Sequence, residues 1–438
     1  MRPQFKILSD DLVQTILEEA HALLLDPGVR VHNQEALELL AEGGAQVDFV
    51  SQIAALPEKM VQTALDTAPS DFDLYDFDGR PAVHYGGDAV HFDPGSAAIN
   101  LLDHETQTQR PPLTQDFVRF VQLVEVLPQL DAQSTALICA DVPEEIGDLY
   151  RLYLALNFIR KPIVTGAFRK DTWWTMRELL VTWVGGEKEL AQKPVAVFDV
   201  CPSPPLLWSD LTCQNLIDCA RANIPAELVS MPLAGATAPV TLAGAVVQHA
   251  AECLSGVVIC AYLGMTDSKI VDAQAGMEAA GGTILAALAG INMVSGAGMM
   301  DFESCQSFEK LVLDAEIIGM AKRLLAGIEA REETLALSVM RELGHRADYL
   351  THPQTLRWFK EEFYIPSQVV DRGSLDAWER SGKHSAAQRA AARVEQLLKD
   401  YKPLALTDEM RAELRQITAK AAQSFGMTEL PALDIFGE

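Results

Sequence analysis

The sequence predicts an α/β fold in which short buried strands alternate with helices. From Pro111 onward, β-branched runs that end in Gly, Pro or small residues alternate with helix-like segments of roughly 12 to 18 residues. Repeated strand–helix units form parallel sheets with right-handed crossovers. Six such strands, with more helix after Ser307, favour a TIM-type (β/α)8 barrel. A doubly wound open sheet is the alternative, and the absence of G-x-G-x-x-G after the first strand and of G-x-x-x-x-G-K-[ST] counts against it.

The predicted elements of the barrel follow from these runs. The strands are expected at 136–142, 162–168, 195–202, 226–233, 259–265 and 291–298. The helices are expected near 113–127, 146–159, 171–185, 209–222, 241–258 and 273–289.

Two further regions flank the barrel, which is expected over 111–345. Residues 1–110 read as an N-terminal α+β segment, with helices from Ser9 or Asp10 to Leu25, over 33–42 and after Pro57 to 67. Short alternating pieces over 72–103, with Gly and Asp at turns, predict small antiparallel strands. Residues 346–438 form a helical extension, whose helices are expected at 353–363, 384–401 and 408–425, after a helix at 307–327.

Composition limits the function. Of the 438 residues, 49% are hydrophobic. The chain has 35 Lys and Arg and 61 Asp and Glu residues, which gives a net charge of 35 − 61 = −26. Nucleic acid and anionic membrane surfaces need positive charge at the contact, so neither is expected as a partner. The acidity suits a basic protein or a cationic substrate, or it is only a solvated surface.

The sequence also predicts a cytoplasmic location. The N-terminus has no basic stretch followed by an apolar one, and no run of about 18 uncharged apolar residues occurs. Seven scattered cysteines without a C-x-x-C pair predict reduced, mostly buried thiols.

Candidate functional residues gather in three polar stretches where strands end or helices begin. These stretches are 262–276, 295–306 and 351–354. Asp267, Asp272, Asp301 and Glu303 would surround one mouth with carboxylates, which suits a cationic substrate. The alternative is structural: Asp267 and Asp272 cap the next helix, Glu303 caps the helix at Ser307, and His352 is a helix-entry residue.

Other chemistries are not indicated. The nine histidines are not paired at i, i+4 spacing, so no metal site is expected. The sequence has no G-x-S-x-G motif that would support a Ser-His-Asp triad. A lyase or aldolase would need a Schiff-base lysine at a strand end, for which Lys269 is the nearest candidate.

Long segments of the chain resemble, in order, those of the trimethylamine methyltransferase family. They include LLLDPGVRVHNQEALELLAEGGAQVD, KPIVTGAF, PLAGATAPVTLAGAVVQHAAECLSG, AYLGMTDSKIVDAQAG, AALAGINMVSGAGMMDFESCQSFEKLVLDAEIIGM and HPQTL. The resemblance implies a TIM barrel that moves a methyl group from a methylated amine to the cobalt of a separate corrinoid protein. The resemblance also implies that the protein binds no cofactor tightly and that it forms a homo-oligomer.

The chain has only standard residues, so it is similar to the non-pyrrolysine members that demethylate quaternary amines such as glycine betaine. No residue is assigned as a catalyst. The residues expected in the substrate pocket or on the corrinoid-facing rim are Tyr262, Asp267, Asp272, Gln274, Asp301, Glu303 and His352. A quaternary nitrogen would be held there by carboxylates or aromatic faces.

The chain departs from the family pattern near Cys260. Cys253 to Cys260 runs directly into Ala261 and Tyr262, where the family has a further strand and helix. A helix would pass into a strand with no turn residue after Gly256, although such connections usually take about 2–6 residues. The barrel is therefore expected to lack about one βα unit. This leaves a second hypothesis: a degenerate barrel that binds a betaine-like ligand or the corrinoid protein without turnover.

Overall fold

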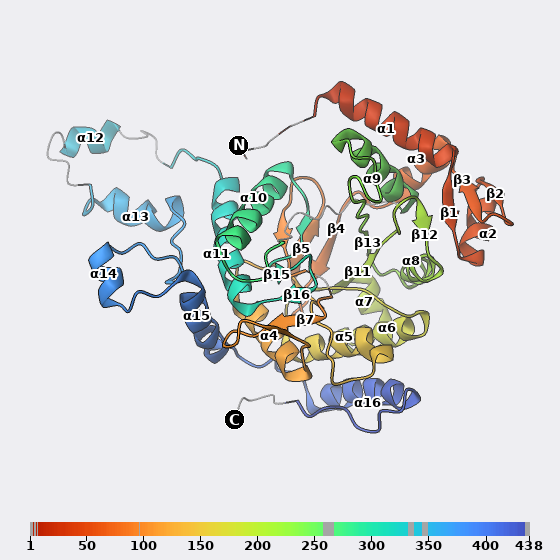
Figure 1. Ribbon diagram of the computed structural model, residues 1–438. Helices are drawn as coiled ribbons and strands as arrows, with labels where there is room; N and C mark the ends of the chain where they lie inside the picture. Colours follow the sequence, from red (N-terminus) through yellow and green to blue (C-terminus); the bar gives the residue numbers. More distant parts are fainter. Residues whose placement is uncertain are drawn as a thin grey trace.

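The computed structural model describes residues 3, 6, 8–95, 97–256, 267–331, 337–343 and 349–433, and it is an α/β protein. Helices are arranged around a group of short strands (Figure 1). The strand predicted over 259–265 lies outside the described residues.

Six short strands form the centre of the described fold. In spatial order they are β13 (Ala226–Leu228), β11 (Ala196–Val200), β10 (Ile163–Thr165), β9 (Gln133–Ser134), β6 (His91–Phe92) and β14 (Met293–Val294). The pairs β13–β11, β11–β10, β10–β9 and β6–β14 are parallel. The Asp131 N–H donates to the Phe92 carbonyl over 2.8 Å, and a parallel bridge joins Ala98 to Leu137, so β6 and β9 are also neighbours.

The helices that cover these strands begin and end where local signals predict. They are α4 (Thr114–Val126), α5 (Gly147–Phe158), α6 (Lys170–Val184), α8 (Asp210–Ala222), α9 (Leu242–Gly256), α10 (Ala273–Ala289) and α11 (Phe308–Leu325). Ser209 and Ser307 cap α8 and α11 by accepting from the backbone N–H groups of Thr212 and Lys310. Shorter pieces, η1 (Glu144–Ile146) and α7 (Glu187–Gln192), lie between them.

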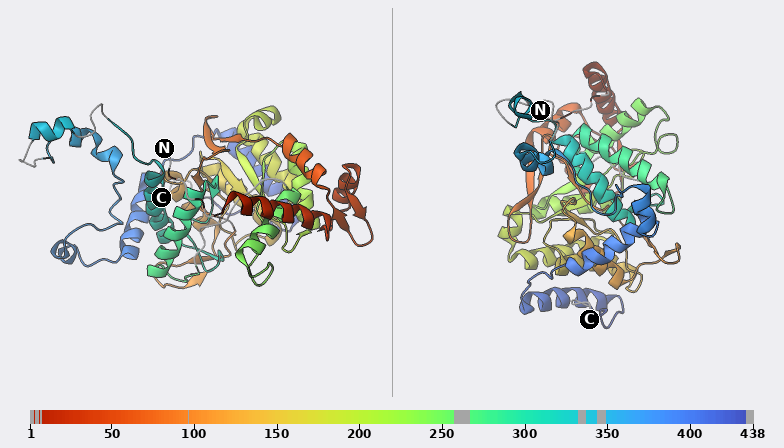
Figure 2. Two further views of the ribbon diagram at one scale, coloured as in Figure 1. Left: turned by 90° about the horizontal axis from the view of Figure 1, so that it is seen from above. Right: turned by 90° about the vertical axis from the view of Figure 1, so that its left-hand side faces the viewer.

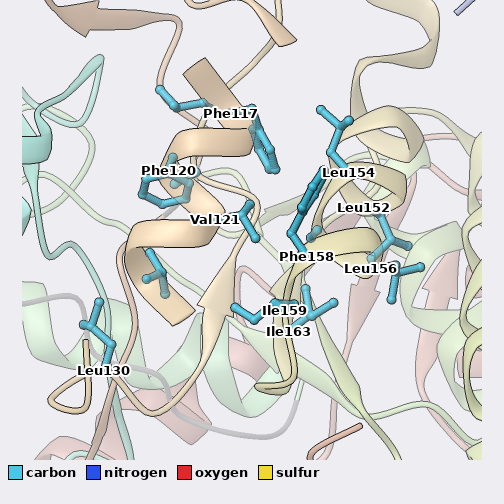
Figure 3. Close-up of a cluster of buried hydrophobic side chains, with 14 of the residues drawn as sticks. Phe117, Phe120, Val121, Leu130, Leu152, Leu154, Leu156, Phe158, Ile159 and Ile163 are labelled. Atoms are coloured by element: carbon cyan, nitrogen blue, oxygen red, sulfur yellow. The ribbon is translucent and has the colours of Figure 1, made fainter. Parts of the chain in front are cut away.

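The main core lies between the strands and their helices. Phe117 and Val121 of α4 face Phe158 of α5, close to Ile163 of β10, and Phe120 packs in the same core from the other side of α4 (Figure 3). All five side chains are 0–1% exposed. Removing apolar surface from water is favourable by about 25 cal/mol per Å², so burying these side chains stabilises the position of α4 and α5 on the sheet.

A hairpin covers the opposite side of the strands. It consists of β4 (Phe72–Tyr75) and β5 (Pro81–Tyr85), which pair antiparallel. Leu74 and Val83 of the hairpin pack in one cluster with five side chains, each of which lies in one of the central strands or next to it: Ala132, Val164, Val197, Val229 and Met293. Val164, Val197 and Met293 thus point to one common side of the sheet, and the alternation of a strand puts Gly166, Asp199 and Ser295 on that side too.

The N-terminal region packs on α8 and α9. Its elements are α1 (Asp10–Leu25), β1 (Val29–Val31), α2 (Gln34–Glu42), β2 (Gln46–Asp48), β3 (Ile53–Ala55) and α3 (Glu58–Thr67), and β1 pairs with β12 (Leu207–Trp208). Ile16, Ala20 and Leu24 are the buried residues of α1. None of the described helices is long and apolar enough to cross a membrane.

The C-terminal region is helical, as predicted. It contains α12 (Leu337–Leu343), α13 (Pro353–Glu362), α14 (Leu375–Arg380), α15 (Ala386–Asp400) and α16 (Asp408–Ser424). Helix α15 packs on α11 and α4, and α16 packs on α5 and α6. The segment with α12, α13 and α14 stands out from the body (Figures 1 and 2).

Two predictions about strands are wrong in part. The strand expected at 136–142 is instead Gln133–Ser134, because pairing with β10 selects the residues that reach it. The pieces over 72–103 are not all antiparallel. The strands β4 and β5 pair antiparallel, and so do β7 (Asn100–Leu102) and β8 (Gln109–Arg110). In contrast, β6 pairs parallel with β14, and β7 pairs parallel with β16 (Cys305–Gln306).

Candidate active site

Polar side chains converge at the carboxyl ends of the central strands. Asp93 follows β6, Asp199 is the penultimate residue of β11, and Ser295 follows β14. The carboxyl ends of parallel strands meet at one edge of a sheet, where active sites of α/β proteins lie. The candidate site is built around these three residues.

Asp93 is fully buried, and one of its oxygens is held in place. Oδ1 accepts from the Gly95 N–H over 2.8 Å and from the Ser295 hydroxyl. Among the described residues, no donor reaches the buried Oδ2. Burial raises the pKa of Asp93 to about 6, although these two hydrogen bonds oppose the shift.

Asp199 shares its surroundings with two other carboxylates. Burial and, after it, the negative charges of Asp93 and Glu303 together raise the pKa of Asp199 to about 8, while Arg151 opposes the shift. Asp93, Asp199 and Glu303 therefore form one electrostatic unit, called the carboxylate cluster below.

Glu303 reaches the cluster from a strained loop. The loop joins β15 (Met299–Met300) to β16, and Asp301, Phe302 and Glu303 have φ values of 49°, 54° and 65°. A left-handed conformation costs a residue with a side chain roughly 1–2 kcal/mol. Such strain persists where the surroundings fix it, and it concentrates at functional sites.

Asp301 anchors this loop. Its carboxylate accepts from Gln109 Nε2 and Ser304 Oγ, each over 3.2 Å, and its Oδ1 lies 3.2 Å from Lys269 Nζ. The helix-capping interpretation of Glu303 is wrong, because Ser307 itself caps α11. Glu303 is the residue from the sequence prediction that the structure brings to the cluster.

A buried ion pair holds the turn that carries Ser295. Lys310 Nζ and Asp314 Oδ2 lie 2.5 Å apart on α11, and their side chains are 1% and 6% exposed. Asp314 Oδ2 also accepts from the Gly298 N–H over 2.7 Å. The pair therefore fixes the turn after β14 and, through Ser295, the orientation of Asp93.

The other predicted residues lie elsewhere or have local contacts. Asp272 caps α10 by accepting from the Ala275 N–H over 3.0 Å, and exposed Gln274 donates to Glu278 over 2.9 Å. Asp267 is exposed, and its backbone N–H donates to Glu278.

His352 caps α13 on the segment that stands out from the body (Figure 1). Tyr262 and Cys260 lie outside the described residues. A role for these residues at the substrate or corrinoid-facing rim stays a prediction.

The sequence prediction missed Asp93 and Asp199. Asp199 stands alone as a charge in the apolar run 195–202, and a charge inside a predicted buried strand is a signal for a site. Asp93 precedes Pro94 and Gly95 at the end of a strand that was expected to belong to a small antiparallel sheet. No group of three or more metal-binding side chains occurs in the described part of the chain. Of the six cysteines in that part, five are buried and Cys201 is exposed.

Comparison with known proteins identifies the family. The profile described as trimethylamine methyltransferase matches residues 1–263 and 260–426. The chain belongs to the trimethylamine methyltransferase family. It is 26% identical to trimethylamine methyltransferase of Desulfitobacterium hafniense, over 96% of this chain and 94% of that one.

Other similar proteins have related names. The chain is 27% identical to glycine betaine methyltransferase of Desulfitobacterium hafniense, over 97% of this chain and 98% of that one. Among solved structures, the monomethylamine methyltransferase of Methanosarcina barkeri matches with a TM-score of 0.45 and 10% identity, over 92% of this chain and 89% of that one.

Proposed function

We propose that the protein transfers a methyl group from a quaternary amine to Co(I) of a separate corrinoid protein, in the cytoplasm. Membership in the family and relatives named for trimethylamine and glycine betaine support an amine substrate. The quaternary amine, the corrinoid acceptor and the absence of a tightly bound cofactor are parts of the proposal.

The carboxylate cluster is the observation that carries the proposal. A quaternary nitrogen has no N–H and makes no ordinary hydrogen bond, so its positive charge must be balanced by nearby negative charges or aromatic faces. Asp93, Asp199 and Glu303 supply negative charge at one edge of the sheet, where burial weakens the competition from water. The free site is expected to hold protons on part of the cluster and to release them when the cation binds.

The reaction needs positioning more than acid–base chemistry. The electron pair of Co(I) forms the new bond to the methyl carbon, and the C–N bond breaks with its pair going to nitrogen. The tertiary amine leaves neutral, so the chain has no proton to move in this step. The cluster would hold the nitrogen while the methyl group faces the acceptor, and such alignment can contribute about 7–11 kcal/mol to the barrier reduction.

We also propose that the central strands belong to a TIM-type barrel with seven βα units. Six neighbouring strands and the strand predicted over 259–265 give that number. Two facts support a missing unit. The family match divides into two parts that meet at 260–263. The alignment with glycine betaine methyltransferase spans 477 positions, but 97% of 438 residues is about 425, so roughly 50 positions have no residue of this chain.

The proposed loss of one βα unit also favours a second candidate function. If the missing unit carried part of the substrate pocket, the barrel would bind a betaine-like ligand or the corrinoid protein and transfer nothing. The carboxylate cluster would then serve binding alone.

Cobalamin spectroscopy distinguishes the two functions. The purified full chain is mixed with Co(I) cobalamin and a panel of quaternary and tertiary amines, and methyl-Co(III) is followed by its absorption. We expect methyl-Co(III) with at least one quaternary amine, and a loss of at least about tenfold in rate for Asp199→Asn and Glu303→Gln, since about 1.4 kcal/mol is a factor of ten. Glu18→Gln on exposed α1 is the matched control and should leave the rate unchanged.

If none of the amines gives methyl-Co(III), but calorimetry shows that an amine still binds, the second function is favoured. Equal rates for Asp199→Asn and the wild type would contradict the role of the cluster.

A further inference from the structure

Glu227 lies next to the carboxylate cluster, on the strand that neighbours Asp199. Strands β11 and β13 pair parallel, and Asp199 is the register partner of Glu227. Register partners in parallel strands point to the same side of a sheet, and neighbouring strands are about 4.8 Å apart. Alternation along the chain gives the same result, because Val229, two residues further, packs with the hairpin of β4 and β5. Glu227 is 4% exposed and therefore brings a further buried carboxyl group beside Asp199.

The hairpin supplies a partner for this carboxyl group. Tyr85 is the last residue of β5, and its hydroxyl donates a hydrogen bond to Glu227 Oε1. The Tyr85 side chain is 5% exposed, and its ring stacks on that of Phe72 with a centroid distance of 4.6 Å and an interplanar angle of 7°. Because a buried, stacked ring has little freedom to turn, the hydroxyl holds Glu227 in one orientation.

The hairpin is itself attached to the strands that lead into the site. The His84 N–H donates to Nε2 of His91 in β6 over 3.0 Å. At the other end, the Tyr75 N–H donates to the Pro194 carbonyl, shortly before β11, over 2.8 Å. The two strands of the hairpin accordingly lie in the middle of the body (Figure 1). The position of the hairpin is therefore fixed relative to the carboxylate cluster.

We propose that Glu227 is a further cation-holding residue of the site and that Tyr85 is the residue that positions it. This inference rests on the proposed function. A hydrogen bond donated to a carboxylate favours its charged form, so Tyr85 keeps negative charge on Glu227 where burial and a neighbouring acid oppose it. Glu227 acts on the cation directly, and Tyr85 acts through Glu227 alone.

The two neighbouring acids have different roles. Two carboxyl groups on adjacent strands do not ionise together readily, because the first negative charge opposes the second. The pKa of Asp199 is raised to about 8, mainly by burial, so near neutral pH this group keeps its proton in the free site. Glu227 supplies charge in the free site, and Asp199 adds its own charge when the cation displaces its proton.

Calorimetry with tetramethylammonium tests both residues in the full chain. Glu227→Gln should weaken binding at least about tenfold at about pH 9, since about 1.4 kcal/mol of lost attraction is a factor of ten. Tyr85→Phe keeps the ring and removes the hydroxyl, so it should weaken binding near neutral pH. At about pH 9 it should recover most of the wild-type affinity, because Glu227 then ionises without its donor. A purely structural role of Tyr85 predicts the same loss at every pH.

Two further variants complete the comparison. Tyr85→Phe combined with Glu227→Gln should bind no more weakly than Glu227→Gln alone, because Tyr85 acts through Glu227. Tyr75→Phe is the matched control, since Tyr75 belongs to the same hairpin and its ring lies against Lys193, and it should bind like the wild type. Circular dichroism at both pH values verifies that each variant is folded.

Infrared difference spectra of the chain without any ligand separate this inference from the proposed function. Between about pH 6 and about pH 9, the protonated carboxyl band that Asp199→Asn removes reports the proton of Asp199. Glu227→Gln should move the midpoint of that band to lower pH, because the neighbouring negative charge is gone. If the wild type binds no amine, the proposed function fails, and the infrared shift alone supports the pairing of Glu227 with Asp199. An unchanged midpoint, or a wild-type Kd in Glu227→Gln, overturns the inference.

Discussion

The affinity of the carboxylate cluster for a cation should rise steeply with pH. Burial and neighbouring carboxylates raise the pKa of Asp199 to about 8 and burial raises that of Asp93 to about 6. Below its pKa each carboxyl is neutral, so a quaternary ammonium must displace a proton to gain the attraction. The affinity is therefore fully present above about pH 8 and is lost progressively as the pH falls through about 8 and then about 6.

Coulomb's law gives the magnitude. A cation about 5 Å from an ionised carboxylate at an effective dielectric constant of about 20 gains about 3 kcal/mol, which corresponds to a factor of roughly 100 in affinity. We therefore expect the Kd of tetramethylammonium to be up to about 100-fold lower at about pH 9 than at about pH 6.

Isothermal titration calorimetry measures this dependence directly. Titrations in buffers with different ionisation heats should show proton release on binding near neutral pH. Asp199→Asn should lose the dependence between about pH 7 and 9 and keep the part near pH 6 that belongs to Asp93, whereas Glu18→Gln should behave as the wild type. A wild-type Kd that is constant over this range would refute the reasoning, and no binding at either pH would contradict the assignment of a cation site.

Two further predictions concern the framework of the site. Lys310→Met should lower the free energy of unfolding by about 3–5 kcal/mol, because it leaves the buried Asp314 charge uncompensated. Lys310→Met with Asp314→Leu should recover much of that loss in urea unfolding, and an equal loss in both variants would contradict the explanation. Phe120→Ala in the core should cost about 3–5 kcal/mol in the same assay, with amine affinity unchanged at a temperature where the variant is folded. A loss below about 1 kcal/mol would show that the core closes around the missing ring.

Local signals were enough for the helices. Ser9, Asn33, Ser209, Asp272 and Ser307 each accept from a backbone N–H at a helix start, as their types predict. Helix starts depend on side chains within a few residues, so the sequence places them well. The alternation of helices and short apolar runs also predicted an α/β protein.

The strands depended on distant residues. His91 and Phe92 pair with Met293 and Val294, about 200 residues away, and this pairing places Asp93 beside Ser295. Nothing near Asp93 in the sequence shows that contact, so the prediction put it in a small antiparallel sheet. Glu303 was predicted as a site residue from its polar stretch, but its approach to Asp199 depends on three left-handed residues fixed by Gln109 and Lys269.

The sequence by itself determined the family, the helices and the acidic character of the protein. Those properties are local or additive, because caps, periodicity and charge can be read residue by residue. The tertiary structure decided which acids share one site. Asp93, Asp199 and Glu303 are far apart along the chain. The parallel pairing of the strands brings the first two to one edge, and the left-handed loop between β15 and β16 brings Glu303 to them, so that burial and mutual repulsion raise the pKa of Asp199.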